Sequence, residues 1–324
     1  MKNRPILIIM GEPYSVFLEL IFKVFKSDFI TKVKRPIVLI GSKKLLQGQM
    51  NILGYKFKVK TMLPAEIKKS INLYKTINLI DVNFDHKKSF DQISKKSNKY
   101  IKDCFSVAMN LINRDNKISL INGPISKKHF LKGRSLGITE YLAKKTNKNN
   151  NVAMLIYNKK LSVSPITTHL ALKNVNKHVS KEKIYTHIKL ISEFYKKNFK
   201  KNPKIAITGL NPHCESNFKD CEEDAIIIPA IKDLKAKNFR VQGPFPADTI
   251  FMQEHIKKFD IIVGMYHDQV LAPMKAIFGF DAINITLGLP FIRISPDHGP
   301  NSSMLGKNLS NPKSLIEALK FLDK

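Results

Sequence analysis

The sequence predicts an α/β protein with two lobes, built on a mostly parallel sheet with some antiparallel strands. The first observation behind this fold class is that short apolar runs, typical of buried strands, alternate with segments of helical periodicity. The second is that residues 151–170 divide into two apolar runs around an Asn-Lys-Lys turn, which predicts an antiparallel pair. The third is size, because 324 residues with 43% hydrophobic content can bury a substantial core.

The expected strands are short apolar runs rich in isoleucine, leucine and valine. Apart from the pair within 151–170, they cover residues 6–11, 36–41, 117–123, 204–210, 239–244, 259–264 and 282–288. The stretch GMYHDQVLAPMK (264–275) follows one of these strands, and we expect it to be a loop. Loops at the ends of parallel strands often carry functional residues, so this stretch is a candidate for the site.

Three helices are predicted with identifiable boundaries or faces. The clearest covers 89–114, where apolar residues including Cys104 recur at helical spacing. Another is expected over 222–238, although Pro229 must be tolerated there or must kink the helix. The last begins at Asn311-Pro312, a good capping residue followed by proline at the first helical position.

No internal repeat or low-complexity linker marks a boundary between the lobes. We expect one lobe from residues 1–125 plus 286–324 and the other from 126–285, with a crossing near the loop 124–137. No apolar run reaches the roughly 18–20 residues of a membrane span. The apolar run near the N-terminus is too short for the core of a signal peptide. The expected location is therefore the cytoplasm, with no membrane partner.

The net charge of +29 is compatible with a nucleic-acid partner. However, only six of the 55 basic residues are arginine, and lysine, asparagine and isoleucine are abundant throughout the chain. This pattern indicates a compositional bias spread over a solvated surface, and we find no nucleic-acid motif. We therefore do not expect the protein to bind nucleic acid. The three cysteines do not make a disulfide framework, and we expect reduced thiols.

Three histidines, His169, His213 and His267, directly follow expected strands. The carboxyl ends of parallel strands share one edge of a sheet, so these three side chains can converge. Three neutral imidazoles with an open coordination position form a common catalytic site for zinc or another divalent metal. The alternative is that each is an ordinary loop histidine, and spacing alone does not decide between the two.

Four further polar residues lie near the same expected edge: Lys275, Asn284, Arg293 and Asp248. In a chain so rich in lysine, an arginine near a strand end suggests that its planar fork is needed for a phosphate or carboxylate. A structural ion pair is the alternative for Arg293. Asp248 is either an acid/base carboxylate or the N-cap of a helix over 249–256.

Together these stretches resemble one family, the 4-hydroxythreonine-4-phosphate dehydrogenases of pyridoxal phosphate biosynthesis. The resemblance runs in order along nearly the whole chain, which makes it far more specific than any single motif. It is carried by GEP (11–13), NGPISK (122–127), TEYLA (139–143), TTHL (167–170), GLNPH (209–213), GPFPADT (243–249), MYHDQ (265–269), NITLGLPFIRIS (284–295) and DHG (297–299).

The resemblance implies a two-lobed α/β/α fold similar to the isocitrate and isopropylmalate dehydrogenases. It implies a homodimer whose active site lies in a cleft near the dimer interface, with metal site and dimer contacts in the second lobe. His169, His213 and His267 would then hold a divalent metal such as zinc, magnesium or cobalt, one of them supplied by the partner subunit. Thr139, Lys275, Asn284 and Arg293 would bind a phosphorylated substrate.

The implied reaction is the oxidation of the secondary alcohol of 4-phosphohydroxy-threonine by NAD⁺ or NADP⁺. The resulting 3-oxo acid loses CO₂ to give an amino-ketone phosphate. Lys275 and Asp248 are the candidates for moving the proton, and Asp268 is expected to orient an imidazole. The residues that bind the nicotinamide cofactor are left unassigned, because no cofactor fingerprint is present.

Three departures from the family pattern bear on this function. Ile138 stands where the family usually has histidine before the Thr-Glu pair. The segment 14–18 lacks the usual glycines, and the loop 300–306 after Asp297-His298-Gly299 lacks the usual aspartate. The tripeptide Asp297-His298-Gly299 is also a candidate nucleotide-binding turn.

These departures leave three alternatives beside the main reading. One is a relative that acts on another phosphorylated hydroxy acid, such as a threonate or erythronate phosphate. Another is a metal-binding protein without a nicotinamide cofactor. The third is a basic nucleic-acid-binding protein on an inherited enzyme scaffold.

Overall fold

The computed structural model describes residues 4–70, 72–73, 75–131, 137–148, 151–215, 221–279, 281–296 and 299–324. The chain forms two compact units, called unit 1 (Met1–Ser135 with Pro290–Lys324) and unit 2 (Leu136–Leu289). Each unit is described by itself below. Asp297, His298 and residues 132–136 of the expected crossing loop 124–137 lie outside the described residues. The assignment of dimer contacts to one lobe stays a prediction.

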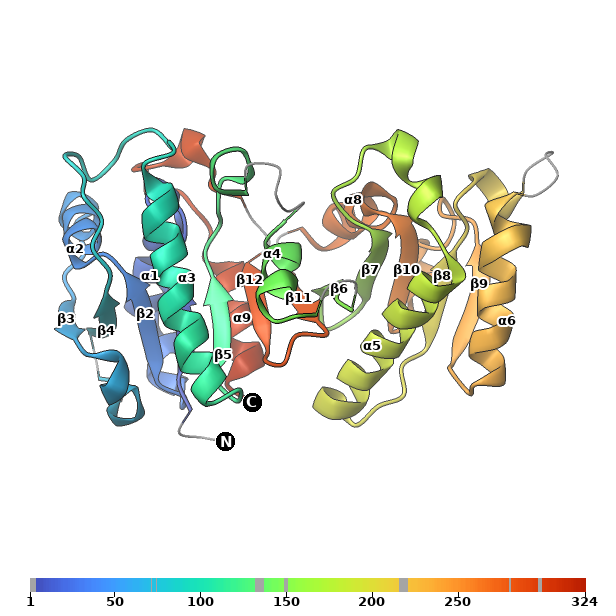
Figure 1. Ribbon diagram of the computed structural model, residues 1–324, viewed down its shortest axis with the longest axis horizontal. Helices are drawn as coiled ribbons and strands as arrows, with labels where there is room; N and C mark the ends of the chain where they lie inside the picture. The colour runs from blue at the N-terminus through green and yellow to red at the C-terminus, as the bar shows by residue number, and fades with distance from the viewer. Residues whose placement is uncertain are drawn as a thin grey trace. The chain divides into compact units, whose positions relative to one another are not determined.

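Unit 1 is built on parallel strands (Figure 1). The strand order is β3-β4-β2-β1-β5-β12, and every neighbouring pair in it is parallel. All four residues of β1 are buried, as a central parallel strand covered on both faces requires. The bounds are β1 (Ile6–Ile9), β2 (Ile37–Gly41), β3 (Lys58–Thr61), β4 (Thr76–Asp81), β5 (Ser119–Asn122) and β12 (Arg293–Pro296).

The helices of unit 1 are α1 (Phe17–Lys26), α2 (Lys43–Ile52), α3 (Ser97–Arg114) and α9 (Lys313–Leu322). The expected helix 89–114 is α3, and its Cys104 is fully buried in the core. However, α3 begins at Ser97 instead of residue 89. Local bonds explain the later start, because Ser94 accepts hydrogen bonds from Lys96 and Ser97 that compete with helix formation.

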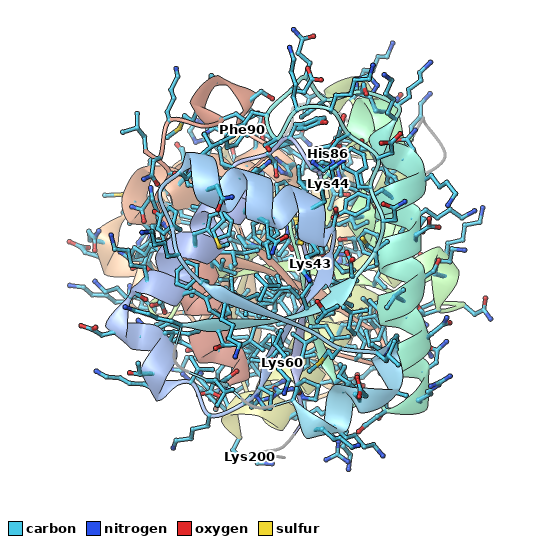
Figure 2. All side chains as sticks on the ribbon, turned by 90° about the vertical axis from the view of Figure 1, so that its left-hand side faces the viewer. Lys43, Lys44, Lys60, His86, Phe90 and Lys200 are labelled. Carbon is cyan, nitrogen blue, oxygen red and sulfur yellow. The ribbon has the colours of Figure 1, made fainter. Side chains whose placement is uncertain are left out.

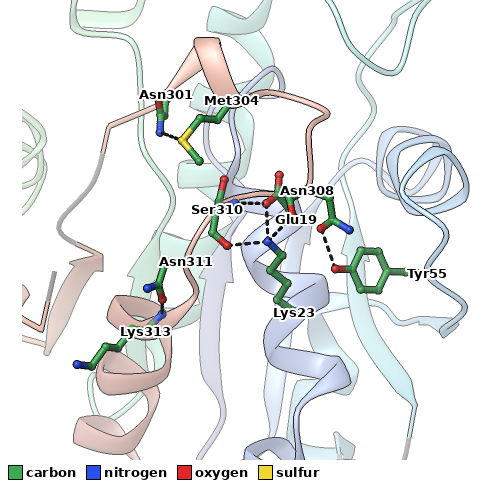
Figure 3. A network of polar contacts seen from close by, with 9 residues as sticks. All are labelled: Glu19, Lys23, Tyr55, Asn301, Met304, Asn308, Ser310, Asn311 and Lys313. Carbon is green, nitrogen blue, oxygen red and sulfur yellow. Dashed lines mark hydrogen bonds and ion pairs between the residues drawn. The ribbon is translucent and has the colours of Figure 1, made fainter.

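A buried carboxylate fixes the C-terminal part of the chain to α1 (Figure 3). Glu19 accepts hydrogen bonds from the Ser310 backbone N–H at 2.6 Å and from Lys23 Nζ at 2.9 Å. Lys23 also donates to the carbonyl oxygens of Asn308 and Ser310. Both bonds to Glu19 end at Oε1, while its Oε2 is buried without a hydrogen-bond partner among the described residues. The pair Glu19–Lys23 is an ion pair inside unit 1 that links α1 to the segment before α9.

Lysines project from several separate elements of unit 1. Figure 2 labels Lys43 and Lys44 at the start of α2 and Lys60 on β3. Three of the four residues of β3 are exposed, and two of those are lysines. Charged side chains on an exposed edge strand discourage pairing with another chain, which gives this part of the charge a structural use.

Unit 2 has the strand order β11-β6-β7-β10-β8-β9. The neighbours β11–β6 and β6–β7 are antiparallel, whereas β7–β10, β10–β8 and β8–β9 are parallel. The α/β fold class, mostly parallel with some antiparallel strands, is therefore confirmed. The bounds are β6 (Ala153–Tyr157), β7 (Ser162–Thr167), β8 (Ile205–Thr208), β9 (Val241–Phe245), β10 (Ile261–Tyr266) and β11 (Ile283–Leu287).

The helices of unit 2 are α4 (Ile138–Lys145), α5 (Lys181–Phe199), α6 (Ile228–Ala236), α7 (Gln253–Ile256) and α8 (His267–Phe278). In Figure 1, α5 runs in front of the strands of unit 2, and α6 lies beside β9. The expected helix 222–238 forms as a π-helical turn over Glu223–Ile227 that continues directly into α6. Pro229 is the second residue of α6, so the missing N–H of proline lies where the hydrogen-bond pattern changes.

The expectation that 264–275 forms a loop is wrong. Strand β10 continues to Tyr266, and α8 starts at the next residue and runs through Pro273. A proline inside a helix removes one backbone hydrogen bond, but burial of Val270, Leu271 and Met274 against the core offsets that loss. Among the described residues, no helix is long and apolar enough to cross a bilayer.

Candidate active site

The three strands that precede the histidines lie side by side in unit 2. Strand β10 is the middle one, and it pairs in parallel with β7 on one side and β8 on the other (Figure 1). The chain continues from β7 to His169, from β10 to His267 and from β8 to His213. These three residues are called the histidine set. Their strands end at one edge because parallel neighbours point the same way.

His267 and His169 lie close together at this edge. Their ring centroids are 5.7 Å apart, with an angle of 39° between the ring planes. His267 is the first residue of α8, and its Nδ1 lies 2.6 Å from Oδ1 of the neighbouring Asp268. When Nδ1–H donates to this carboxylate, the tautomer leaves the lone pair on Nε2 for a metal ion.

His213 has different surroundings. It lies in the loop after β8 with a left-handed backbone, and the φ angles of His213 and Cys214 are 57° and 60°. Its Nδ1 is 3.9 Å from Oδ2 of Asp248, and both side chains are more than half exposed. Across the described part of the chain, no three or more His, Cys, Asp or Glu side chains gather as a metal site. The three-histidine site therefore stays a prediction.

The donor chemistry nevertheless suits a divalent transition metal. Two imidazoles, His169 and His267, lie close together, and the Nδ1 of His267 is within hydrogen-bond distance of a carboxylate. A third imidazole follows the adjacent strand. Such nitrogen donors are the ligands that zinc and cobalt favour.

A second carboxylate lies beside His169. Thr168 Oγ1 donates to Glu140 Oε1 at 3.2 Å, while Glu140 Oε2 is buried without a hydrogen-bond partner among the described residues. A Cβ atom on Gly137 would come within 3.0 Å of the His169 ring and 2.8 Å of Glu140 Oε2. Glycine at 137 therefore lets the α4 N-terminus approach His169. Sequence reasoning missed both residues, although the TEYLA segment contained Glu140 as a signal.

Of the expected substrate-binding residues, Thr139 contacts β11 from α4 and Asn284 belongs to β11. Thr139 Oγ1 lies 3.3 Å from Thr286 Oγ1, and both residues are buried. Asn284 is two residues before Thr286 on the same face of the strand. Its Oδ1 is buried and has no hydrogen-bond partner among the described residues, which leaves an acceptor available to a ligand.

Lys275 and Asp248 are more exposed. Lys275 belongs to the last turns of α8, eight residues after His267, which is about 12 Å along a helix axis. Asp248 is not the cap of a helix, because α7 starts only at Gln253 and its N-cap residue is Met252. That alternative is wrong, while the contact of Asp248 with His213 keeps the acid/base role open as a prediction.

Arg293 belongs to unit 1 and is fully buried. It is the first residue of β12, and its Nε donates to Oδ1 of Asn122 at 2.7 Å. Asn122 ends the neighbouring parallel strand β5 and is itself 2% exposed. The role of Arg293 as a phosphate ligand stays a prediction.

The segment 14–18, which lacks the family's usual glycines, packs bulky side chains into the core of unit 1. Val16 and Phe17 are buried, and Tyr14 packs edge-on against Phe84 with ring centroids 6.0 Å apart. Gly11 has a φ of 72°, and a Cβ there would lie 2.6 Å from the carbonyl oxygen of Pro124. Gly11, which precedes this segment, is thus required by a close backbone approach.

A cavity of about 700 Å³ lies within unit 2. Its lining includes Thr139, Glu140 and Thr168 near the histidine set, together with Lys183 and His187 from α5. Burial lowers the pKa of His187 to about 4, so this ring is neutral at physiological pH. Burial also lowers the pKa of Lys183. The walls thus combine hydroxyl, carboxylate and amine groups with apolar side chains.

The chain matches the family described as "Pyridoxal phosphate biosynthetic protein PdxA" over residues 32–322. It is 37% identical over 320 residues to a 4-hydroxythreonine-4-phosphate dehydrogenase from Sulfurihydrogenibium sp., covering 97% of this chain and 96% of the relative. It is 30% identical to the D-threonate 4-phosphate dehydrogenase of Salmonella typhimurium, covering 99% and 98%. The structure of a 4-hydroxythreonine-4-phosphate dehydrogenase from Klebsiella pneumoniae superposes with a TM-score of 0.84, at 29% identity, covering 99% and 97%.

Proposed function

Because the chain belongs to the PdxA family of pyridoxal phosphate biosynthetic proteins, we propose that it is an NAD(P)-dependent dehydrogenase acting on 4-phosphohydroxy-threonine. The enzyme oxidises the secondary alcohol to a ketone, and the 3-oxo acid loses CO₂ to give an amino-ketone phosphate. The observation that carries this proposal is the pair His169–His267, at the ends of adjacent strands, with Asp268 bonded to one imidazole.

In this proposal the histidine set holds a divalent metal, of which zinc, magnesium and cobalt are the candidates. A bound divalent cation supplies Lewis acidity for the alcohol oxidation and for the decarboxylation that follows. The side chain of Asp268 keeps the Nε2 lone pair of His267 available by accepting from Nδ1–H. The proposal includes a homodimer in which the partner subunit contributes one histidine to each site.

The proposed substrate-binding residues are those that the resemblance to the family assigns. In unit 2, Thr139 of α4 supplies a hydroxyl next to Thr286, and Asn284 of β11 supplies an amide oxygen. Lys275 supplies an ammonium group for the phosphate and, with Asp248, a route for the proton released on oxidation. In unit 1, Arg293 supplies a guanidinium, whose Nε is already held by Asn122.

A second substrate, D-threonate 4-phosphate, is favoured by a specific observation. A relative with that activity in its name aligns over 99% of this chain, and the position before Thr139 is the apolar Ile138. The two substrates differ at carbon 2, which carries an ammonium group in one and a hydroxyl in the other. An isoleucine cannot hydrogen-bond to either group, so the neighbouring Glu140 carboxylate becomes the candidate for discriminating between them.

The test is a turnover assay on metal-loaded, full-length protein with each substrate and each nicotinamide cofactor, following reduced nicotinamide. We expect the highest kcat/KM with 4-phosphohydroxy-threonine and loss of turnover with a chelator. A higher kcat/KM with D-threonate 4-phosphate would assign the second function. Absence of turnover with both substrates would contradict the dehydrogenase proposal as stated.

A further inference from the structure

A buried amide joins the strand ends beneath the histidine set. Gln269 is in the first turn of α8, two residues after His267, and its side chain is 8% exposed. Its Oε1 accepts from the backbone N–H of Met265 at 2.7 Å and from Thr208 Oγ1 at 2.9 Å. Its Nε2 donates to the carbonyl oxygen of Gly209 at 2.8 Å. One side chain is thus bonded to the ends of both β10 and β8.

Two more buried side chains extend these bonds to the remaining strand and loop. Thr167, the last residue of β7, donates from Oγ1 to the carbonyl oxygen of Met265 at 2.7 Å. Glu223 Oε1 accepts from the backbone N–H groups of Leu210 and Asn211 at 2.7 and 2.9 Å. Thr167, Thr208, Gln269 and Glu223 are called the strand-end frame. Their bonds reach the backbone before His267 and before His213, and Thr167 itself lies two residues before His169.

The three hydrogen bonds of Gln269 require a side chain that both accepts and donates. Its oxygen accepts twice while its nitrogen donates, which an apolar or carboxylate side chain cannot do at neutral pH. The backbone makes room for it, since a Cβ on Gly264 would lie 2.9 Å from Gln269 Oε1. Without the amide, a buried N–H, hydroxyl and carbonyl lose their partner together, and the strand ends must move to recover one.

We propose that Gln269 is a positioning residue that fixes the backbone of the strand ends from which His267 and His213 follow, and thereby the metal affinity of the sites to which these histidines contribute. This inference rests on the metal site of the proposed function. Gln269 itself contacts backbone and Thr208, so its effect on a metal ion is transmitted through the backbone of β8 and β10. Partners of this indirect kind commonly change metal affinity by about 10–100-fold when removed.

The test is a Co²⁺ titration of full-length, metal-freed protein, followed by the visible absorption of the bound ion, with Zn²⁺ competition for affinity. We compare Gln269→Leu, Thr208→Val and Tyr195→Phe with the unsubstituted chain. Thr208→Val keeps the shape and removes one of the three bonds of Gln269. Tyr195→Phe is the matched control, because it removes a buried hydrogen bond to Ser162 at the opposite end of β7.

We expect Gln269→Leu to raise the Kd at least about tenfold and to change the Co²⁺ spectrum. Thr208→Val should shift both in the same direction by a smaller factor, and Tyr195→Phe should leave both unchanged. Thr208→Val decides the question if Gln269→Leu does not fold. Unchanged affinity and spectrum in the folded frame variants, or an equal loss in Tyr195→Phe, would overturn the positioning role.

One further variant separates this inference from the function on which it rests. His267→Ala should abolish the Co²⁺ signal if the histidine set is the metal site. If His267→Ala binds Co²⁺ as the unsubstituted chain does, the metal site of the proposed function fails, and the positioning role is overturned with it. If His267→Ala loses the metal while both frame variants keep it, the site stands and only the role of Gln269 is overturned.

Discussion

Polar side chains at the strand ends are used differently in the two units. In unit 2, buried side chains such as Gln269 and Glu223 bond mainly to backbone, and the imidazoles beyond them are partly exposed. In unit 1, the buried Arg293 and Asn122 bond to each other, and Glu19 forms a closed network with Lys23. We infer from this comparison that the partly exposed imidazoles of unit 2 are available to a ligand, whereas the buried Glu19–Lys23 pair of unit 1 serves the fold.

This difference predicts which measurement responds to a substitution. A histidine of unit 2 should affect chemistry while leaving the free energy of unfolding nearly unchanged. A buried charge of unit 1 should affect the free energy of unfolding first. The predictions below follow this contrast, from the largest expected effect to the smallest.

The largest effect is expected from His267→Ala. Loss of one metal ligand should lower metal-dependent kcat/KM by on the order of 10³-fold or more, corresponding to about 4 kcal/mol. The side chain is 34% exposed, so the free energy of unfolding should change by only about 0.5 kcal/mol. Turnover and urea unfolding of the same preparation test both halves. Equal loss of stability and activity would contradict the contrast between the units.

In unit 1, Glu19→Leu should destabilise the fold by about 3–5 kcal/mol, because it leaves the Lys23 ammonium without its carboxylate in a largely buried site. The Ser310 backbone N–H loses its acceptor at the same time. Glu19→Gln is the matched control, since it keeps the acceptor and should cost less. Urea unfolding measures both variants. A Glu19→Leu variant as stable as the unsubstituted chain would show that the network in Figure 3 is not structural.

A third prediction concerns a histidine of unit 2 that serves the fold. Burial lowers the pKa of His187 to about 4 in the folded chain, against about 6.5 when unfolded. As the pH falls from 6.5 to 4, His187 is therefore protonated in the unfolded state and neutral in the folded state. Stability present above pH 6.5 should decline through this window by about 3 kcal/mol. Urea unfolding at pH 7 and pH 4.5 measures the decline, and His187→Phe should reduce it; an unchanged slope would exclude His187 as its source.

The smallest effect is expected from Asp268→Ala, which removes the acceptor from Nδ1 of His267. The carboxylate side chain is 82% exposed, so water partly replaces it. We expect metal affinity to fall by about tenfold, the lower end of the range for such partners. Asp268→Asn keeps an acceptor oxygen and should lose less, as measured by Zn²⁺ competition. If Asn and Ala weaken binding equally, the charge of Asp268 matters and its hydrogen bond does not.

Apolar pattern predicted most of the strands because burial on both faces leaves a direct mark on the sequence. Strands β3, β4 and β12 escaped prediction. The exposed edge strand β3, Lys58–Thr61, does not require apolar residues, whereas Asn78 and Arg293 are polar residues inside the buried strands β4 and β12. Helix α8 was taken for a loop because Pro273 resembles a turn signal, and only packing against the core keeps the helix intact.

For the candidate site, parallel topology predicted that the three histidine-bearing strands end together, and the structure places them side by side. Parallel topology did not predict that Gln269 bridges β8 and β10. Two of its partners, Thr208 and Gly209, are about 60 residues away in the sequence, so the MYHDQ motif gives no sign of them. Glu223 follows His213 by ten residues, and its bonds to Leu210 and Asn211 arise only when the chain folds back. Such roles depend on tertiary contacts that spacing does not encode.

The central claim is that the histidine set of unit 2 is a divalent metal site. The most direct measurement is anomalous diffraction at the zinc edge from crystals of the zinc-loaded protein. We expect a peak about 2.0–2.1 Å from Nε2 of His169 and His267, with His213 of the same or the partner subunit completing the site. A zinc-loaded crystal whose peaks all lie away from these imidazoles would contradict the claim.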